Sequence, residues 1–357
     1  MNIKRILICI YFLFICLSAA ALSADTIKTL WSVSHFGDED FFHRPSDIEI
    51  DRLQSFIYIA DSGNHRVLVF DFNGKFIKII GRKGQGTAEF VSPTGLYVFK
   101  DSRLAVADFI NNRIQIFDKS GNFLRSINTK EVRVADLIFV NNKFYTIPSF
   151  GTSGPSLNMG SKEDAQPIVV VLDDQGNKIQ DISVDDFPET HPFVRAIKHR
   201  VCLALSPENK LYLPYFAMNV IHVFDLDGTK VAEFKRPLPF KPITPKLEQQ
   251  KSSKDGVIQM IASLDIVCNA AKFGPDNNLY ILSHKESLHK RMKGIKKSED
   301  LLPPPMQIEV IDPNSKEVVF YIATDPGVKA FALIDKGRLV YIHEDSEGEL
   351  ILKCIQF

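Results

Sequence analysis

The chain is poor in cysteine and has no excess of either charge. Five cysteines among 357 residues are too few for the disulfide framework that stabilises many small secreted domains. The 43 basic and 43 acidic residues balance, so a positive field over the whole domain is absent and no nucleic-acid partner is expected. A hydrophobic share of 45% is enough to build a large core instead.

The sequence also lacks the short motifs that carry common chemistries. Its 9 histidines include no pair at His-x-His or His-x-x-x-His spacing, so no compact zinc-binding motif is present. Neither a Gly-x-Ser-x-Gly elbow nor a glycine-rich phosphate loop occurs. No metal ion or other cofactor is therefore expected.

The N-terminus carries an apolar stretch that falls short of a membrane span. Residues 6–17 are apolar, follow Lys4 and Arg5, and precede a small-residue segment, Ser18–Ala24. This order is that of a secretory signal peptide, whereas a spanning helix needs ~20 apolar residues. We expect residues 1–24 to be removed, which leaves an exported, periplasmic or extracellular protein with no stable membrane span. An uncleaved anchor is the alternative.

Residues 56–81 form a unit that the chain repeats. Three apolar runs, Phe56–Ala60, Val67–Phe70 and Phe76–Ile80, are separated by turns rich in Asp, Asn and Gly, a pattern typical of antiparallel strands joined by hairpins. The unit returns at residues 104–127 with a spacing of 47 residues. A fixed period of this length that carries only strands predicts propeller blades.

These residues resemble the NHL-repeat family. The shared pattern is Pro-x-Gly/Asp-Ile/Leu, then Tyr-Ile-Ala-Asp, then Asn-x-Arg-Val/Ile-x-Val/Ile-Phe-Asp, and it is sharpest over residues 42–127. The resemblance implies a β-propeller, usually of six blades. It implies no single activity, because such propellers serve as protein-binding, RNA-binding and catalytic scaffolds.

The repeat units lack one strand. Six first, second and third strands can be counted, but the last unit stops at Phe357 after its third strand. Because an open sheet edge is a liability, residues 27–37 are predicted to supply the missing outer strand. We therefore predict an all-β, six-bladed propeller of four-stranded antiparallel blades over residues 25–357, closed by an N-terminal strand in the last blade, and a monomer.

The long insertions all fall on connections that share one rim of a propeller. Residues 149–167 and 283–306 join second and third strands, while residues 184–200 and 235–267 cross between units. Long loops in a compact domain are usually functional, so this rim and the central channel are predicted to bind a ligand. Within 235–267, a cluster of apolar residues at rough helical spacing predicts one helix.

The candidate ligand-binding residues are acids of the channel and cations of this rim. Asp47 and Asp136 hold corresponding positions in two units and are expected to face the channel. The rim cations are Arg195, His199, Arg200, His289, Lys290 and Arg291. Such cations suit an acidic or phosphate-bearing ligand, although a charge run is more often a solvated loop. Residues 285–297 are expected to be dispensable for stability.

Two functions stay open. The first is a binding propeller that holds a protein, peptide or glycan. The second is a metal-assisted hydrolase or lyase, lactonase-like or amidating-lyase-like, that uses Asp47, Asp136 and His199. The zinc lyases of the family carry a histidine after the proline of the first strand, where this chain has Ser46 and Thr94, and two carboxylates are few for a calcium site.

Two residue pairs have structural explanations. Asn64 with Arg66, and Asn111 with Arg113, fall at turns, where asparagine tolerates the backbone and arginine can bind carbonyl oxygens at the blade edge. Cysteines 202 and 268 fall in corresponding first strands of neighbouring units and could meet, although buried apolar roles are the simpler expectation for both and for Cys354.

Overall fold

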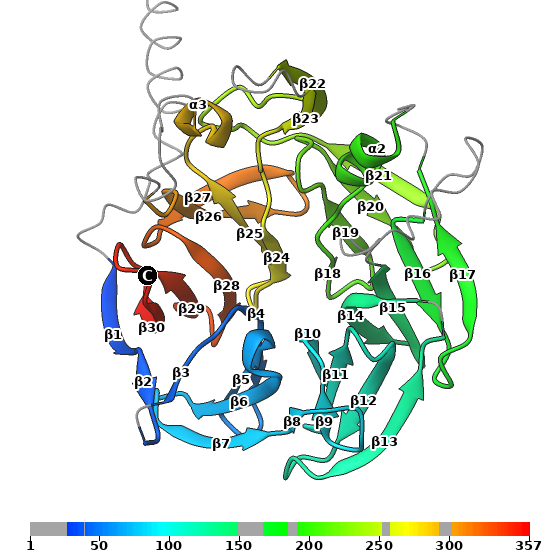
Figure 1. Cartoon of the computed structure of the whole chain (residues 1–357), viewed down its shortest axis with the longest axis vertical. Coiled ribbons are helices and arrows are strands. Elements are labelled where there is room, and N and C mark those ends of the chain that lie inside the picture. The colour runs from blue at the N-terminus through cyan, green and yellow to red at the C-terminus, as the bar shows by residue number, and fades with distance from the viewer. Residues whose placement is uncertain are drawn as a thin grey trace, which may run out of the picture.

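Six four-stranded antiparallel sheets surround a central axis as the blades of a propeller (Figure 1). The computed structural model describes residues 27–38, 40–130, 132–148, 167–184, 191–251, 258–292 and 302–357. The prediction of an all-β, six-bladed propeller is confirmed. The predicted signal peptide lies outside the described residues.

Each blade runs outward from an inner strand at the channel. Blade one contains β4 (Pro45–Asp51), β5 (Phe56–Asp61), β6 (Arg66–Asp71) and β7 (Phe76–Ile80). Blade two contains β10 (Pro93–Val98), β11 (Leu104–Asp108), β12 (Arg113–Phe117) and β13 (Phe123–Asn128). Blade three contains β14 (Val134–Val140), β15 (Lys143–Pro148), β16 (Val169–Leu172) and β17 (Lys178–Ile182).

The other three blades follow the same order. Blade four contains β18 (Ala204–Leu205), β19 (Leu211–Pro214), β20 (Ile221–Phe224) and β21 (Lys230–Phe234). Blade five contains β24 (Ala270–Phe273), β25 (Leu279–His284), β26 (Met306–Asp312) and β27 (Glu317–Ala323). Blade six contains β28 (Val328–Leu333), β29 (Arg338–Glu344), β30 (Leu350–Gln356) and, outermost, β1 (Lys28–Val33).

Strand β1 joins the two ends of the described chain. It pairs antiparallel with β30, so that Val33 lies opposite Leu352. The indole Nε1 of Trp31 donates a hydrogen bond to the carbonyl oxygen of Phe72 in blade one, at 3.0 Å. The same ring lies so close to Gly74 that a Cβ there would stand 2.7 Å from it. One short strand therefore contacts both the last and the first blade.

The middle strands of a blade are buried on both faces. In β5 and β6 nearly every residue is buried, because neighbouring blades cover both sides of each sheet. In the outer strand β7, partly buried and exposed residues alternate up to the buried last residue, and in the outer strand β13 most residues are exposed. This difference explains why the second and third strands are continuous apolar runs in the sequence.

The hairpins between third and fourth strands share one turn. In blade one, the carboxylate of Asp71 accepts hydrogen bonds from the backbone amides of Asn73 and Lys75, at 2.8 and 2.9 Å. Gly74 adopts a φ of 80°, a left-handed conformation that favours glycine. Equivalent glycines of blades two to four have φ of 81°, 84° and 88°, so this repeated Asp-x-x-Gly motif is structural.

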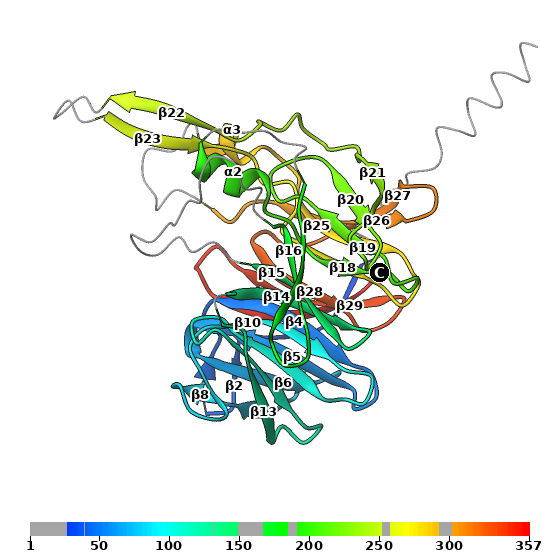
Figure 2. The same ribbon diagram turned by 90° about the vertical axis from the view of Figure 1, so that its right-hand side faces the viewer.

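The insertions that the structure describes gather on one side of the ring, as the edge-on view shows (Figure 2). They are helix α2 (Pro192–Lys198), helix α3 (Leu288–Met292) and a hairpin of β22 (Lys246–Lys251) and β23 (Ile258–Ser263). The helix predicted within 235–267 is wrong, because this hairpin occupies that crossover. The β-branched Ile258 and Ile261 favour a strand, and the rough helical spacing of the apolar residues in this segment was misleading. Residues 149–166 lie outside the described part.

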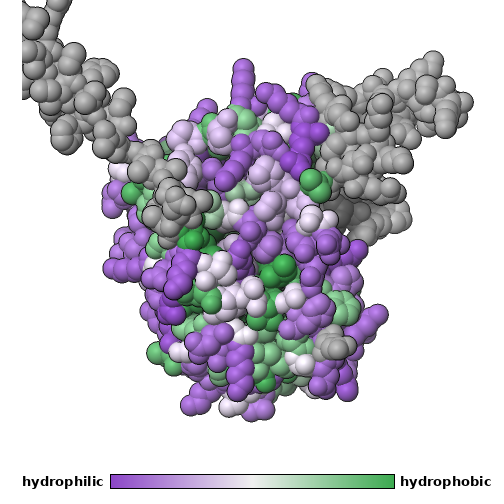
Figure 3. Space-filling view, turned by 90° about the vertical axis from the view of Figure 1, so that its left-hand side faces the viewer, coloured by the Kyte–Doolittle hydropathy of each residue, from purple (hydrophilic) through white to green (hydrophobic). Residues whose placement is uncertain are grey.

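The face of the molecule that carries β1 is mostly polar. On the side that carries β1, hydrophilic side chains dominate and hydrophobic ones form small separate groups (Figure 3). Among the described residues, no helix has both the length and the apolar character needed to cross a membrane.

Candidate functional site

A cavity of about 540 Å³ occupies the central channel and is lined by the inner strand, or the residues leading into it, of all six blades. This volume is within the range of small-molecule sites. Its wall is not uniformly apolar, since it contains six charged side chains: Asp47, Glu49, Asp136, Arg52, Arg200 and Lys272.

Lys272 of blade five reaches across to blade one. Its Nζ atom lies 3.1 Å from Asp47 Oδ1 and 2.8 Å from the carbonyl oxygen of Ile48, and it also forms an ion pair with Glu49. Burial alone would lower the pKa of Lys272, but the two carboxylates outweigh it and hold the pKa above its usual value. The side chains of Lys272, Asp47 and Glu49 remain 21%, 14% and 27% exposed, so the cluster faces the channel.

Asp136 is the carboxyl group of this cluster that the protein neutralises least. Burial, and then the negative charge of Asp47, raise the pKa of Asp136 to about 7. Its Oδ1 atom accepts a hydrogen bond from the backbone amide of Leu137 at 2.8 Å, and no side chain of the described residues donates to it. Burial likewise raises the pKa of Glu49, with Lys272 opposing the effect. Among the described residues, Lys272 is the cation that pairs directly with this cluster of three carboxyl groups.

Local backbone geometry positions the two aspartates. The pairing of β4 shifts register between Pro45 and Asp47, and that of β14 shifts between Val134 and Asp136. After each bulge the aspartate accepts a hydrogen bond from the next backbone amide, at 2.8 Å in both blades. Because a bulge re-aims the side chain, both carboxylates turn into the channel.

Blade two carries a glycine at the same position. A Cβ on Gly95 would stand 2.9 Å from the Cα atom of Asp136, so a third aspartate would collide with β14. The backbone amide of Leu96 instead donates to Asp47 Oδ2 at 2.9 Å. This close approach explains why only two of the three neighbouring blades contribute an acid.

The rim that carries α2, α3 and the β22–β23 hairpin is called the decorated rim, and the end of the cavity nearest to α2 is called its mouth. Arg200 follows α2 and its guanidinium lies 4.0 Å from the centre of the Phe216 ring, and both residues line the cavity. Asn269 also lines it, and the buried Oδ1 atom of Asn269 has no hydrogen-bond partner among the described residues. Ser46 donates to the carbonyl oxygen of Thr94 at 2.8 Å, so these two hydroxyl residues belong to the wall.

The structure brings together three of the eight predicted site residues, since Asp47, Asp136 and Arg200 line one cavity. Arg195 lies on α2 and the buried His199 caps its C-terminus, and neither lines the cavity. A combined site of Asp47, Asp136 and His199 is therefore not formed.

The remaining three candidates lie on α3, away from the cavity lining, and α3 is anchored to the fold. The buried carboxylate of Asp265 accepts hydrogen bonds from Ser287 Oγ at 2.8 Å and from the backbone amide of His289 at 3.0 Å. Arg291 pairs with Glu286 at 2.5 Å. That residues 285–297 are dispensable for stability stays a prediction, and their removal would take these donors away from Asp265.

Sequence reasoning missed Glu49 and Lys272. Both lie on inner strands, and Glu49 follows Asp47 at the two-residue spacing that places side chains on one face of a strand. That alternation could have identified Glu49. Lys272 could not be paired with it from the sequence, because 223 positions separate the two residues.

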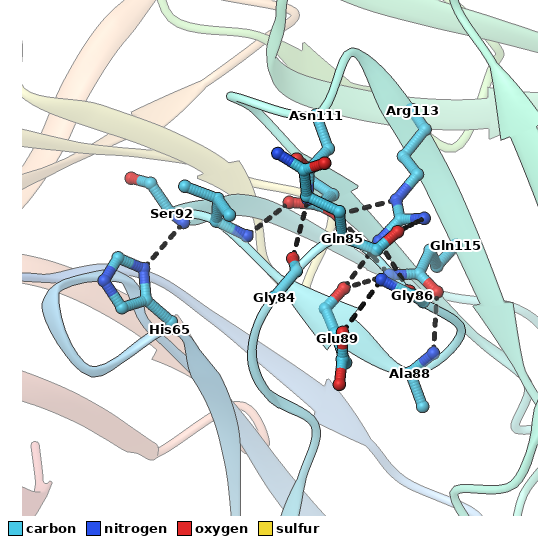
Figure 4. Close-up of polar contacts among 12 residues, drawn as sticks. His65, Gly84, Gln85, Gly86, Ala88, Glu89, Ser92, Asn111, Arg113 and Gln115 are labelled. Carbon is cyan, nitrogen blue, oxygen red and sulfur yellow. Dashed lines mark hydrogen bonds and ion pairs between the residues drawn. The ribbon is translucent and has the colours of Figure 1, made fainter.

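The Asn-x-Arg turns have the structural role predicted for them. Arg113 donates to the carbonyl oxygens of Gln85, Gly86 and Glu89 at 2.8, 2.8 and 2.7 Å (Figure 4). Its Nε atom pairs with the buried Asp108 at 2.8 Å. These bonds fix the crossover before blade two, which contains the short β8 (Arg82–Lys83) and β9 (Glu89–Phe90).

Asp61, Asn64 and Arg66 repeat the arrangement in blade one. Arg66 pairs with Asp61 at 2.8 Å and with Asp40 at 2.5 Å, and Asn64 donates to the carbonyl oxygen of Phe41. Asp40 and Phe41 belong to the hairpin of β2 (His35–Phe36) and β3 (Asp40–Phe41).

In the part of the chain that is described, no three His, Cys, Asp or Glu side chains form a group that could hold a metal ion.

A profile of the family DUF5128, described as a 6-bladed beta-propeller, matches residues 38–270. A member of the DUF4221 family from Bacteroides vulgatus has a similar structure, with a TM-score of 0.58, 10% identity, and coverage of 92% of this chain and 97% of that one. A Bacteroides fragilis protein named as a candidate exported protein aligns with a TM-score of 0.56, 11% identity and coverage of 95% and 98%.

A third similar structure is a catalytically inactive virginiamycin B lyase from Staphylococcus aureus with quinupristin. Its TM-score is 0.50 at 12% identity, with coverage of 93% of this chain and 99% of that one. At sequence identities of 10% to 12%, these similarities show only that the folds are alike. No curated protein matches the chain.

Proposed function

Because this chain belongs to the DUF5128 family of six-bladed β-propellers, a scaffold type that hosts many activities, we propose that it is an exported binding propeller. Its ligand is a peptide that enters from the decorated rim and places a protonated amine in the channel. Export is supported by the apolar N-terminal stretch and by the similar fold of a candidate exported protein.

The local charge balance around Lys272 carries this proposal. Asp47, Glu49 and Asp136 supply three carboxyl groups, and Lys272 supplies one ammonium group among them. The other two cations of the cavity wall are engaged elsewhere, because Arg52 donates to backbone carbonyl oxygens of blade six and Arg200 lies over Phe216. A buried charge without a partner is costly, so a carboxyl group in excess takes up a proton instead. Burial first, and then the negative charge of Asp47, raise the pKa of Asp136 accordingly. A ligand ammonium group beside Asp136 would supply the missing counter-charge.

The mouth of the cavity suits the rest of a peptide. The buried Oδ1 atom of Asn269 is an acceptor for which the described residues provide no donor, and a backbone amide of the ligand would satisfy it. Arg200, held over Phe216, offers donors for a carbonyl or carboxylate group. The ligand would thus contact a cation at the mouth and acids below it.

The proposal is tested by calorimetric titration with short peptides. A peptide with one lysine is compared with the same peptide carrying norleucine, which keeps the chain and removes the charge. The lysine peptide is expected to bind at least tenfold more tightly to the wild type, and Asp136→Asn should remove that preference. Glu347→Gln, at an exposed position outside the cavity, is the matched control and should bind as the wild type does.

Equal affinity for both peptides would contradict the amine-binding channel. The same titrations with Ca²⁺ and Zn²⁺ test the alternative of a metal-assisted hydrolase or lyase. Saturable binding of one ion per chain that Asp136→Asn abolishes would favour that alternative over a binding propeller.

A further inference from the structure

Two thiol groups meet at the seam between blades four and five. The Sγ atoms of Cys202 and Cys268 are 3.3 Å apart, although the residues are separated by 66 positions. Each cysteine lies just before the inner strand of its blade, and both are free thiols. A covalent S–S bond is ~2.05 Å long, so a displacement of little more than 1 Å separates the two thiols from a disulfide.

The two thiols differ in access. Cys202 lines the channel cavity and is partly exposed, whereas Cys268 is fully buried. Burial first, and then the hydrogen bond with Cys202, raise the pKa of Cys268. A small reagent entering the channel would therefore meet Cys202, and Cys268 stands behind it where a second, resolving thiol is needed.

We propose that Cys202 and Cys268 form a disulfide outside the cytoplasm, and that the oxidant is a low-molecular-weight disulfide admitted by the channel. The Cys202 thiolate attacks the oxidant, forms a mixed disulfide and releases one thiolate. Cys268, on losing its proton, attacks the Cys202 sulfur and releases the second. Two protein thiols are oxidised, one small disulfide is reduced to two thiols, and Cys354 stays reduced.

The disulfide would crosslink the blade that has the shortest inner strand. Strand β18 of blade four has only two residues, and the segment before it pairs with blade four through the Val201–Tyr215 bridge and the hydrogen bond from the Cys202 amide to Pro214. Because both cysteines directly precede inner strands, the disulfide would fix two neighbouring channel walls relative to each other. The inference depends on export but not on the identity of the ligand.

Peptide mapping under non-reducing conditions tests the proposal on the full protein. After equilibration of the native protein with glutathione disulfide, trypsin should release residues 201–210 joined to residues 255–272, while Cys354 reacts with an alkylating reagent after unfolding. The melting temperature should fall by about 5 °C when reductant is added, since a disulfide chiefly constrains the unfolded chain. Cys354→Ser should keep this sensitivity to reductant, and Cys202→Ser should lose it.

Full alkylation of both Cys202 and Cys268 after that equilibration would overturn the proposal, as would a joined peptide that contains Cys354. If Cys202→Ser does not fold, the comparison of wild-type protein with and without reductant decides by itself.

Discussion

At the scale of single residues, two groups of charged side chains differ in their access to solvent. One is the channel cluster around Lys272. The other lies between blades four and five, where Arg236 and Glu309 are both fully buried and pair at 2.5 Å. The Lys272 cluster remains open to the channel, whereas the Arg236–Glu309 pair is shielded from solvent. The two should therefore respond differently to substitution.

Asp136 should make stability depend on pH. Its pKa of about 7 in the folded state is above the ordinary value of 3.8, so the folded protein binds that proton more tightly, and ionisation costs stability as the pH rises from about 4 to about 7. Asp136→Asn should remove this cost. Urea unfolding should show the variant gaining more than ~1 kcal/mol relative to the wild type between pH 4.5 and pH 7.5. An unchanged difference would contradict the raised pKa.

Arg236→Met should be strongly destabilising. It leaves the Glu309 carboxylate buried without its counter-charge, which typically costs about 3–5 kcal/mol. The double variant Arg236→Met with Glu309→Leu should recover most of the loss. One nitrogen of Arg236 and one oxygen of Glu309 have no partner among the described residues, and an apolar pair abolishes both deficits. The exposed pair of Lys178 and Asp181 is the control, because Lys178→Met should cost below ~1 kcal/mol.

At the scale of elements, the insertions on the decorated rim are of two kinds. Helix α3 is attached to the body through Ser287 and the buried Asp265. The β22–β23 hairpin pairs only with itself as a two-stranded sheet and projects from the ring (Figure 2). One insertion is therefore part of the folded core and the other is an appendage.

Replacing residues 247–262 with a short glycine-serine link should leave the melting temperature within about 2 °C of the wild type. Ser287→Ala, which removes one donor from Asp265, should lower stability by about 1–3 kcal/mol. Thermal unfolding of the two variants in parallel checks both expectations. A large loss on removal of the hairpin would mean that it packs on the ring.

At the scale of the whole molecule, β1 holds the ends of the described chain together. Trp31 is the single tryptophan and contacts blade one while its strand pairs with blade six. Its fluorescence should shift to the red together with global unfolding. Trp31→Ala should cost about 2 kcal/mol as a half-buried aromatic contact is lost, whereas Leu30→Ala, on the exposed side of the strand, should cost little. A red shift well before global unfolding would show that β1 detaches independently.

The blades could be predicted because their residues repeat, and the site could not because its residues do not. A spacing of 47 residues and the Asp-x-x-Gly turns define the sheets locally. The aspartates of the channel could be predicted as well, because they hold corresponding positions in two repeat units. Lys272, by contrast, becomes a site residue only when the closed ring brings the inner strands of blades five and one close together. The hairpin in place of a helix was missed because short apolar clusters carry no clear period.

The pairing of β1 with β30 has a consequence in time. Val33 is synthesised 319 positions before its partner Leu352, which at about 5–20 residues per second corresponds to about 15–60 s. During that interval β1 has no partner strand, and by its end the five blades between them have all their strands. Translation pauses and holding chaperones that act in this interval would therefore influence the yield of closed rings.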